Sequence, residues 1–260
     1  MSQIGSLNTL IFQVYLLNIN ALKSTLAQSY VLEALAIFQY LTSKQLCTIL
    51  PNVSISTVNR YLRALRKIDK PLVTGLQFGF MPWKWPLAPV YCLTQRWAKW
   101  LAEQWKYSLE NIKRPLGRSC FFAADYYHRI ATIDFKISFI KWISRQWYWL
   151  NFFHCYFERE WSNNSSSWVT SKSKASLSAW DLQIIPDAII GYSSPEWSQL
   201  ILFEQHMGND AKRALRQIQW HCFFLSLWVV NKKYGSQKNS CIYYVFENKS
   251  CMDSVIRRLE

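Results

Sequence analysis

The segments Leu182-Gln-Ile-Ile-Pro-Asp-Ala-Ile-Ile-Gly-Tyr192 and Gln199-Leu-Ile-Leu-Phe-Glu-Gln-His206 decide the fold expected for this chain. Both are rich in isoleucine, leucine and aromatic residues, which favour strands. The segment between them, Ser193-Ser-Pro-Glu-Trp197, has the composition of a turn. The sequence therefore predicts two strands joined as a hairpin.

Two carboxylates stand out in this hairpin, because each follows an apolar run. Asp187 comes after Ile-Ile-Pro and Glu204 after Ile-Leu-Phe. Side chains alternate between the faces of a strand, so Leu202, Glu204 and His206 share one face. Pairing of the strands brings Asp187 beside Glu204. Two buried carboxylates are unfavourable unless a cation neutralises them, and their oxygen atoms suit Mg²⁺ or Mn²⁺.

The rest of residues 118–260 alternates between helical and strand patterns, which predicts an α/β (α+β) domain with a mixed sheet. The expected elements are a helix at 126–147, a strand at 149–157, a polar loop or hairpin tip at 163–178, a helix from Asn209 or Asp210 to about Trp220, a buried strand at 241–246 and a final helix at 252–259.

The first half predicts a winged helix-turn-helix domain at 30–110, after an N-terminal helical extension at 1–29 and before a linker at 107–118. Its expected elements are helices at 30–41, 44–50, 57–68 and 95–105, strands near 71–74 and 90–93, and a wing at 75–89. The expected N-caps are Thr42 or Ser43, Ser54 or Ser56, and Thr94.

The helix at 57–68 carries an apolar stripe, Val58, Tyr61, Leu62, Leu65 and Ile68, with four basic residues mostly off it, Arg60, Arg63, Arg66 and Lys67. A helix fits the major groove of DNA, and guanidinium groups bind phosphates or guanine edges. We therefore expect these four residues to bind DNA. The alternative is a protein–protein module whose arginines form a solvated face.

The charge of the chain also favours a polyanionic partner. The formal net charge is +14, and residues 1–117 hold 13 basic and 4 acidic side chains against 17 and 12 in 118–260. Nucleic acid is the expected partner of such a chain. Aromatic residues make up 17% and could stack on unpaired bases, although most of them are expected in the core.

Other features of the sequence argue against several classes of protein. The seven cysteines form no CxxC pair, and their odd number does not indicate a disulfide framework. The apolar stretch Leu7–Leu22 is interrupted by polar residues and has no basic residue before it, which argues against a signal peptide or a membrane span. We therefore expect a cytoplasmic protein. No phosphate-binding loop is recognisable, which argues against a nucleotide-driven motor.

The spacing of the two acids resembles the signature of the PD-(D/E)xK nucleases, here Pro186-Asp187 and Glu204-Gln205-His206. In that superfamily the acids hold a metal ion that activates water, and the lysine orients the water or stabilises charge on the phosphate. The resemblance implies catalytic and metal-binding roles for Asp187 and Glu204. His206 takes the place of the lysine; neutral imidazole can bind a metal or act as a base, but it supplies no permanent charge.

The chain as a whole resembles the replication-relaxation family of plasmid proteins and the related MOBC-type relaxases, which place a winged helix before a restriction-endonuclease-like domain. The similarity covers roughly residues 30–220. The matching segments are Leu41-Thr-Ser-Lys-Gln-Leu46, Val58–Arg66, Val90-Tyr-Cys-Leu-Thr94, Asp125–Ile130, Phe157-Glu-Arg-Glu160, Ile185-Pro-Asp-Ala188, and Phe203-Glu204 leading through Gly208 to Arg216-Gln-Ile218.

This resemblance implies further site residues. The family has another acid after its long helix, so Glu158, or else Glu160, becomes a third candidate metal ligand; a charged residue of an edge strand is the alternative. The family also has a basic residue on the helix after the second acid, where Lys212, Arg213 and Arg216 lie. Lys212 is the expected catalytic residue, because arginine does not deprotonate and serves only to bind phosphate, the role expected of Arg216.

The resemblance implies a plasmid mobilisation relaxase that nicks one strand of double-stranded DNA at an origin of transfer with Mg²⁺ or Mn²⁺. Single-stranded DNA and an accessory mobilisation protein are further possible partners, and the nucleophile is water or one of 14 tyrosines. A second hypothesis is a catalytically inactive DNA-binding accessory protein or replication regulator with the same fold. A third, a transcriptional regulator with an α/β effector domain, predicts a small-molecule pocket.

Overall fold

The computed structural model describes residues 26–50, 52–78, 87–105, 108–109, 112–115, 125–161, 169–177, 182–234 and 239–260. These residues belong to two compact units, divided between Arg129 and Ile130. The expected N-terminal extension lies outside the described residues, apart from 26–29, which begin the first helix. Most of the expected wing, 79–86, also lies outside them.

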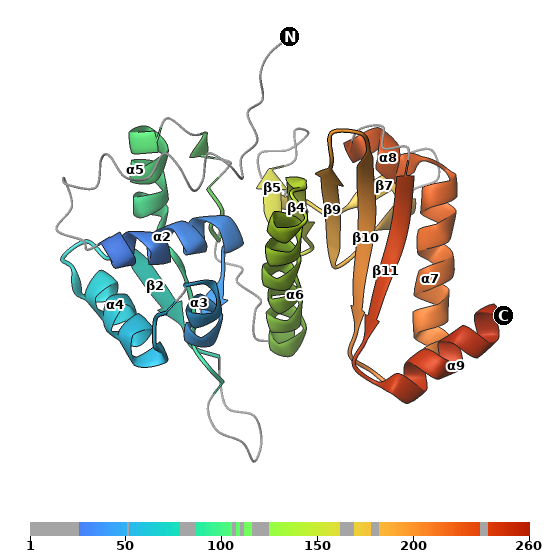
Figure 1. The fold of residues 1–260 in the computed structure, drawn as a ribbon, viewed down its shortest axis with the longest axis horizontal. Helices are drawn as coiled ribbons and strands as arrows, with labels where there is room; N and C mark the ends of the chain where they lie inside the picture. Colours follow the sequence, from blue (N-terminus) through green and yellow to red (C-terminus); the bar gives the residue numbers. More distant parts are fainter. Residues whose placement is uncertain are drawn as a thin grey trace, which may run out of the picture. The chain divides into compact units, whose positions relative to one another are not determined.

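The first unit combines helices with a small sheet (Figure 1). Its elements are α2 (Leu26–Phe38), β1 (Leu41–Thr42), α3 (Ser43–Ile49), α4 (Ile55–Lys67), β2 (Val73–Leu76), β3 (Val90–Leu93) and α5 (Gln95–Trp105). The strands lie in the order β1-β3-β2, and both pairs are antiparallel. The helical segments lie within a few residues of the ranges that the sequence predicted.

Three helices of this unit begin at polar caps. Thr42 and Gln45 form a capping box at the start of α3, and the Ser54 side chain accepts a hydrogen bond from the Thr57 backbone at the start of α4. The Thr94 hydroxyl accepts from the Trp97 backbone at 3.3 Å. Such caps satisfy backbone N–H groups that have no partner inside the helix.

Helix α4 buries one face and exposes its basic side chains. Val58, Leu62 and Leu65 are buried, whereas the four basic residues are exposed, namely Arg60, Arg63, Arg66 and Lys67. The expectation that Ile68 continues the apolar stripe is wrong. The helix ends at Lys67, Ile68 adopts an extended conformation, and 45% of its surface is exposed.

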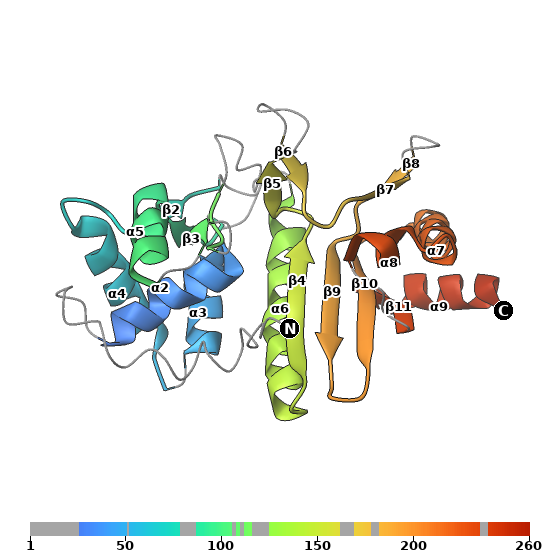
Figure 2. The same cartoon turned by 90° about the horizontal axis from the view of Figure 1, so that it is seen from above.

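The second unit contains a mixed four-stranded sheet. Its main elements are α6 (Tyr126–Arg145), whose first turn precedes the unit boundary, β4 (Trp149–Cys155), β9 (Ala188–Ser193), β10 (Ser198–His206), α7 (Ala211–Ser226), β11 (Asn239–Phe246) and α9 (Lys249–Leu259). The strand order is β11-β10-β9-β4, with β10 and β11 parallel and the other pairs antiparallel. In Figures 1 and 2, α6 lies at the β4 side and α7 beyond β11.

Further short elements lie between these. They are β5 (Arg159–Trp161), β6 (Val169–Ser171), β7 (Ala175–Leu177), β8 (Leu182–Ile184) and α8 (Val229–Tyr234). β5 pairs with β6, and β7 with β8, each pair antiparallel. Within the expected polar loop or hairpin tip at 163–178, residues 169–171 and 175–177 therefore form strands, whereas 163–168 and 178 lie outside the described residues.

The expected continuous strand at 182–192 is wrong. It is broken at Ile185–Asp187, and β8 pairs with β7 instead of joining the main sheet. Proline has no N–H group to donate to a sheet ladder, so Pro186 marks the break. Asp187 consequently stands directly before β9, not at the end of a strand.

Both faces of the main sheet are covered by apolar side chains. On one face Phe135 of α6 stacks on Phe203 of β10, with ring centroids 3.8 Å apart. On the other face Ile189, Leu200 and Leu202 pack with Phe224 of α7 and residues of α8, β7 and β8. This alternation puts Glu204 on the α7 face of the sheet.

Strand β11 is an edge strand, so the expectation that it is buried is wrong. Its side chains facing α7 include Ile242, which packs against the core. On the opposite face Tyr243 and Val245 are 44% and 38% exposed.

Glu33 of α2 gives the first unit a pH-dependent stability. Burial raises the pKa of Glu33 to about 7, so the folded chain holds the proton more tightly than the unfolded chain. Stability is highest at low pH and falls as pH rises from about 4.5 to about 7. We predict that Glu33→Gln stabilises the unit by about 1–2 kcal/mol at pH 8.5, allowing for solvent screening, and changes little at pH 5. Thermal unfolding at both pH values tests this; equal effects would contradict it.

The stack of Phe203 on Phe135 should contribute strongly to the second unit. Phe203 is fully buried, and removing a buried phenylalanine ring typically costs about 3–5 kcal/mol. We predict this loss for Phe203→Ala in urea-induced unfolding. Tyr243→Ala, on the same face of the neighbouring strand but partly exposed, is the control and should cost clearly less.

Candidate functional site

Asp187 and Glu204 meet where β9 begins and β10 nears its end. The antiparallel register pairs Ala188 with Phe203, so the preceding Asp187 stands opposite Glu204. A carboxylate oxygen of Asp187, Oδ2, accepts a hydrogen bond from the Gln205 backbone at 2.7 Å. Both acids are buried. The structure thus brings together the two carboxylates on which the sequence-based site depends.

The surroundings of Glu204 disfavour its ionisation. Burial and the neighbouring Asp187 carboxylate raise the pKa of Glu204 well above its ordinary value. The positive charge of Arg213, on the first turn of α7, acts in the opposite direction. Buried carboxylates whose negative charge is only partly compensated favour binding of a cation.

A histidine and a tyrosine that the sequence did not single out complete this cluster. His221 Nε2 of α7 lies 3.3 Å from Glu204 Oε1, and Tyr244 Oη of β11 lies 2.7 Å from His221 Nδ1. Burial lowers the pKa of His221 to about 4, against the attraction of Asp187. His221 is therefore neutral near pH 7. Burial also raises the pKa of Tyr244, so its phenol stays protonated.

These two residues had only weak signals in the sequence. His221 lies seven residues after the buried Ala214 of α7, two turns along the helix on the core-facing side. Tyr244 lies beside Glu204 in the parallel register of β10 and β11. Only this register, which depends on tertiary structure, connects the tyrosine with the acids.

His206 lies on the same strand face as Glu204 and is buried. Its ring packs against that of Phe246, with centroids 5.6 Å apart. Its Nε2 atom is buried and has no hydrogen-bond partner among the described residues. A buried imidazole nitrogen without a partner is costly unless something else binds it.

Glu158 and Glu160, the candidate third ligands, lie after β4 and in β5. Glu158 Oε1 is 3.1 Å from Lys136 Nζ, and both side chains are almost completely buried. Glu160 pairs with Lys233 at 3.6 Å. The negative charge of Glu158 is thus already balanced within the protein, and its role as a metal ligand stays a prediction.

The other basic candidates of α7 are exposed. Lys212 and Arg216 lie on the first turns of the helix, whose N-cap is Asp210. The hydrogen bond that the Asp210 side chain accepts from the Arg213 backbone is the main cause that lowers the pKa of Asp210. The positive charge of Arg216 acts in the same direction. Helix α7 begins at Ala211, shortly after β10 ends at His206.

The acid pair offers few protein ligands, which suits Mg²⁺ or Mn²⁺ better than an ion that takes all its ligands from the protein. Mg²⁺ is usually bound by one or two carboxylates together with water and substrate phosphates. Asp187 and Glu204 supply two such carboxylates, and the His206 nitrogen without a partner lies on the same face. Within the described part of the chain, no group of three or more His, Cys, Asp or Glu side chains is arranged to hold a metal ion.

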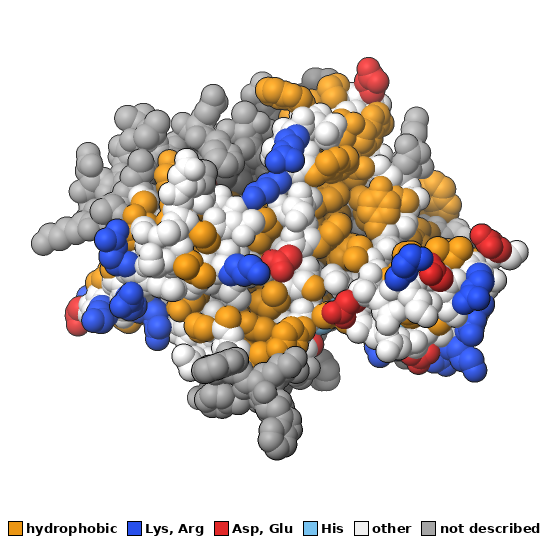
Figure 3. Space-filling model, turned by 60° about the horizontal axis from the view of Figure 1, so that its bottom comes forward, with side chains coloured by type: hydrophobic (Ala, Val, Ile, Leu, Met, Phe, Trp, Pro, Cys, Tyr) orange, Lys and Arg blue, Asp and Glu red, His pale blue; other side chains and the backbone are white. Residues whose placement is uncertain are grey.

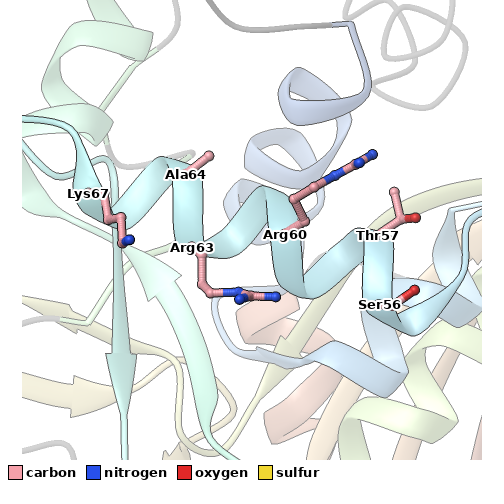
Figure 4. A pocket seen from close by; sticks show the side chains of 6 residues that line it. All are labelled: Ser56, Thr57, Arg60, Arg63, Ala64 and Lys67. Atoms are coloured by element: carbon pink, nitrogen blue, oxygen red, sulfur yellow. The ribbon is translucent and has the colours of Figure 1, made fainter.

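A basic surface covers α4 in the first unit. Figure 3 shows lysine and arginine side chains gathered over this helix. An open groove of about 480 Å³ runs along it, lined by Ser56, Thr57, Arg60, Arg63, Ala64 and Lys67. Figure 4 shows these side chains along α4, with Arg63 and Lys67 on one side of the helix and Arg60 and Ala64 on the other.

Arg66 occupies a different place from the other basic residues of α4. Its guanidinium lies over Gly75 of β2, where an added Cβ would come within 3.3 Å of Arg66 Cζ. The absence of a side chain at Gly75 thus leaves room for the guanidinium of Arg66 beside β2.

Comparisons with known proteins identify no relative: no family model, curated protein or solved structure matches this chain. Among the described helices, none combines the length and the apolar character needed to cross a bilayer.

Proposed function

We propose that this protein is a metal-dependent DNA endonuclease of the relaxase type, which nicks one strand at a plasmid origin of transfer. The observation that carries the proposal is the buried pair formed by Asp187, directly before β9, and Glu204 of β10, with the Gln205 N–H bound to Asp187. A metal held by this pair supplies charge neutralisation and an activated water.

The topology around this pair also supports the proposal. A helix, three antiparallel strands, a helix and a parallel fourth strand follow one another as α6, β4, β9, β10, α7 and β11. This is the arrangement expected of the restriction-endonuclease-like domain that the sequence resembles. The acids stand at the second and third strands of this core, the positions of the Pro-Asp and Glu-x-Lys segments.

The remaining residues of the site have separate tasks in this proposal. Arg213 and the exposed Lys212 and Arg216 bind the phosphate groups of the DNA strand near the start of α7. His206 offers its Nε2 to the water or the phosphate at the acid pair. The packing of β9 and β10 excludes bulk water around the acids, which strengthens every charge interaction there.

The first unit binds duplex DNA in this proposal. The order α2, β1, α3, α4, β2, β3 is that of a winged helix, with α4 as the recognition helix. The exposed basic groove on α4 supports this role. A winged helix of this kind would place the nuclease unit at a chosen DNA site.

A second candidate function is a DNA-binding accessory protein or replication regulator that has lost catalysis. It is favoured by one observation, His206 in place of the lysine, because imidazole lacks a permanent charge. The DNA-binding role of α4 is common to both candidates, so nicking is what separates them.

We predict that the protein converts supercoiled plasmid DNA carrying its origin region into open circles in Mg²⁺ or Mn²⁺ and not in EDTA. Asp187→Asn should reduce the rate on the order of 100-fold or more, because the amide removes one charge from the metal ligands. Gel electrophoresis of the plasmid forms measures this. The control is Glu196→Gln, the same kind of change at an exposed turn; it should nick like the wild type.

Two outcomes of this assay would decide against the first candidate. Nicking that survives in Asp187→Asn would mean that another site, or a contaminant, performs the reaction. DNA binding without nicking by the wild type, even with the accessory mobilisation proteins present, would support the regulator.

We predict that Arg63 and Lys67 contact phosphates of duplex DNA. Each lost contact reduces the slope of log affinity against log salt concentration by about 1, so Arg63→Ala/Lys67→Ala should reduce it by about 2. Fluorescence anisotropy with an origin fragment at several salt concentrations measures the slope. Arg96→Ala/Lys99→Ala on α5 removes the same charge from exposed positions and should leave the slope close to that of the wild type. A wild-type slope in Arg63→Ala/Lys67→Ala would exclude phosphate contacts by these two residues of α4.

A further inference from the structure

The outer face of α7 carries two basic and two aromatic side chains in one row. Figure 1 shows α7 beside β11, with its far side turned away from the sheet. The members of the row, which we call the α7 row, are Lys212, Arg216, Trp220 and Phe223. They follow one another at steps of four, four and three residues, which places them on one side of a helix. All four are exposed.

The two aromatic rings of the α7 row are held in place by their neighbours. Trp220 and Phe223 stack, with ring centroids 5.6 Å apart and planes inclined by 22°. The buried ring of Phe224 meets both of them edge-on, with centroids at 5.5 and 6.1 Å. The Trp220 indole N–H donates a hydrogen bond to the Gln183 carbonyl at 3.4 Å. Rings that are ordered before binding lose little conformational entropy when a flat ligand stacks on them.

Exposed apolar surface continues beyond the α7 row. Trp220 and Phe223 are 40% and 39% exposed, and the next residues along the chain with large exposed apolar side chains are Leu227 and Trp228, at 43% and 58%. A group of exposed apolar side chains of this size commonly marks a binding site.

The charge of α7 and α8 selects among the possible ligands of this surface. The charged residues of the two helices are all basic, namely Lys212, Arg213, Arg216, Lys232 and Lys233. A polyanion is therefore the ligand that the charge favours. Among polyanions, an unpaired nucleic acid strand also exposes flat base faces that stack on aromatic rings, whereas in a duplex each base is covered by its neighbours.

We propose that the α7 row binds an unpaired DNA strand, with Trp220 and Phe223 stacking on bases and the two basic residues binding phosphates. The inference rests on the proposed function for the kind of nucleic acid, and it gives the second unit a binding path for one strand. From Lys212 to Phe223 the row extends about 16 Å along the helix, which corresponds to about five nucleotides of a stacked strand.

The test measures binding of single-stranded DNA in EDTA, where no metal-dependent cleavage occurs. The probe is a fluorescein-labelled thymidine oligonucleotide of about 12 nucleotides, longer than the row, and its anisotropy is followed as the intact chain is added. A duplex and a uridine oligonucleotide of the same length are measured in parallel. The variants are Trp220→Leu, which has no ring face, Trp220→Tyr, which keeps an aromatic ring, Phe223→Leu, and the basic double variant Lys212→Gln/Arg216→Gln.

The controls make the same kinds of change at α6, which covers the other face of the sheet. Lys141 and Arg145 are exposed and have the same spacing as the basic pair of the α7 row, and Trp147 is exposed in the turn after α6. The control variants are therefore Lys141→Gln/Arg145→Gln and Trp147→Leu.

We expect Trp220→Leu to weaken binding of the thymidine strand about 5–140-fold, the effect of losing one stacked base. Trp220→Tyr should recover most of the affinity, and Phe223→Leu should weaken binding as well. Affinity for the duplex should change much less. The basic double variant should reduce the slope of log affinity against log salt concentration by about 1.4, because each phosphate contact of a single strand contributes about 0.7. Both control variants should bind like the wild type.

Three outcomes would overturn the inference. The first is wild-type strand affinity in Trp220→Leu and Phe223→Leu, or an equally large loss in the control variants. The second is tighter binding of the uridine strand, which would assign the row to RNA. The third is a wild-type dimer in analytical ultracentrifugation that Trp220→Leu converts to a monomer with unchanged strand affinity, which would assign the row to a second copy of the chain.

Circular dichroism establishes that each variant is folded. If Trp220→Leu misfolds, Phe223→Leu and the basic double variant decide, because wild-type affinity in the one and a wild-type salt slope in the other would overturn the inference.

The strand measurements and the nicking assay fail independently. If Asp187→Asn stops the nicking while the variants of the α7 row keep wild-type strand affinity, the inference is wrong and the proposed nickase stands. If the wild type does not nick DNA but Trp220→Leu loses strand affinity, the inference stands and the catalytic proposal is wrong.

Discussion

The register between β9 and β10 is the constraint on which the second unit depends. It pairs Ala188 with Phe203 and Ile189 with Leu202, and all four side chains are fully buried. A shift by one residue would turn each side chain to the opposite face of the sheet. Glu204 would then face the aromatic residues of α6, and Phe203 would face α7. The apolar packing on both faces therefore fixes the position of the acid pair as well as the fold.

This register is costly in one respect, because it buries two like charges together. Compensation comes from several elements. The Gln205 backbone binds Asp187, His221 approaches Glu204, and Arg213 adds a positive charge from the start of α7. These contacts still leave the pKa of Glu204 well above its ordinary value, so they do not fully stabilise the negative charge of Glu204. Such an arrangement is typical of a site that binds a cation, since a structural core would be more stable with apolar residues in these positions.

The sequence predicted individual helices, caps and the hairpin better than the tertiary contacts between elements. Helices α3 and α4 and their caps at Thr42 and Ser54 follow from short-range signals, and the hairpin that joins Asp187 to Glu204 follows from apolar runs around a turn. The break at Pro186 was present in the sequence but was outweighed by the apolar residues on both sides. The neighbours of Glu204 on α7 and β11 could not be found in this way, because the parallel register of β11 and the face of α7 depend on tertiary packing.

In the proposed nuclease site, His206 stands where the PD-(D/E)xK signature has a lysine, so a proton would have to be moved by other groups. The permanent positive charge near Glu204 comes from Arg213, which does not deprotonate and so cannot act as a base. Both ring nitrogens of His221 already have partners, Glu204 and Tyr244. His206 differs, because within the described part of the chain its buried Nε2 has no hydrogen-bond partner, and its ring shares the face of Glu204. Of the two histidines, His206 is therefore the one with a ring nitrogen left for a further contact, while His221 already lies between Glu204 and Tyr244.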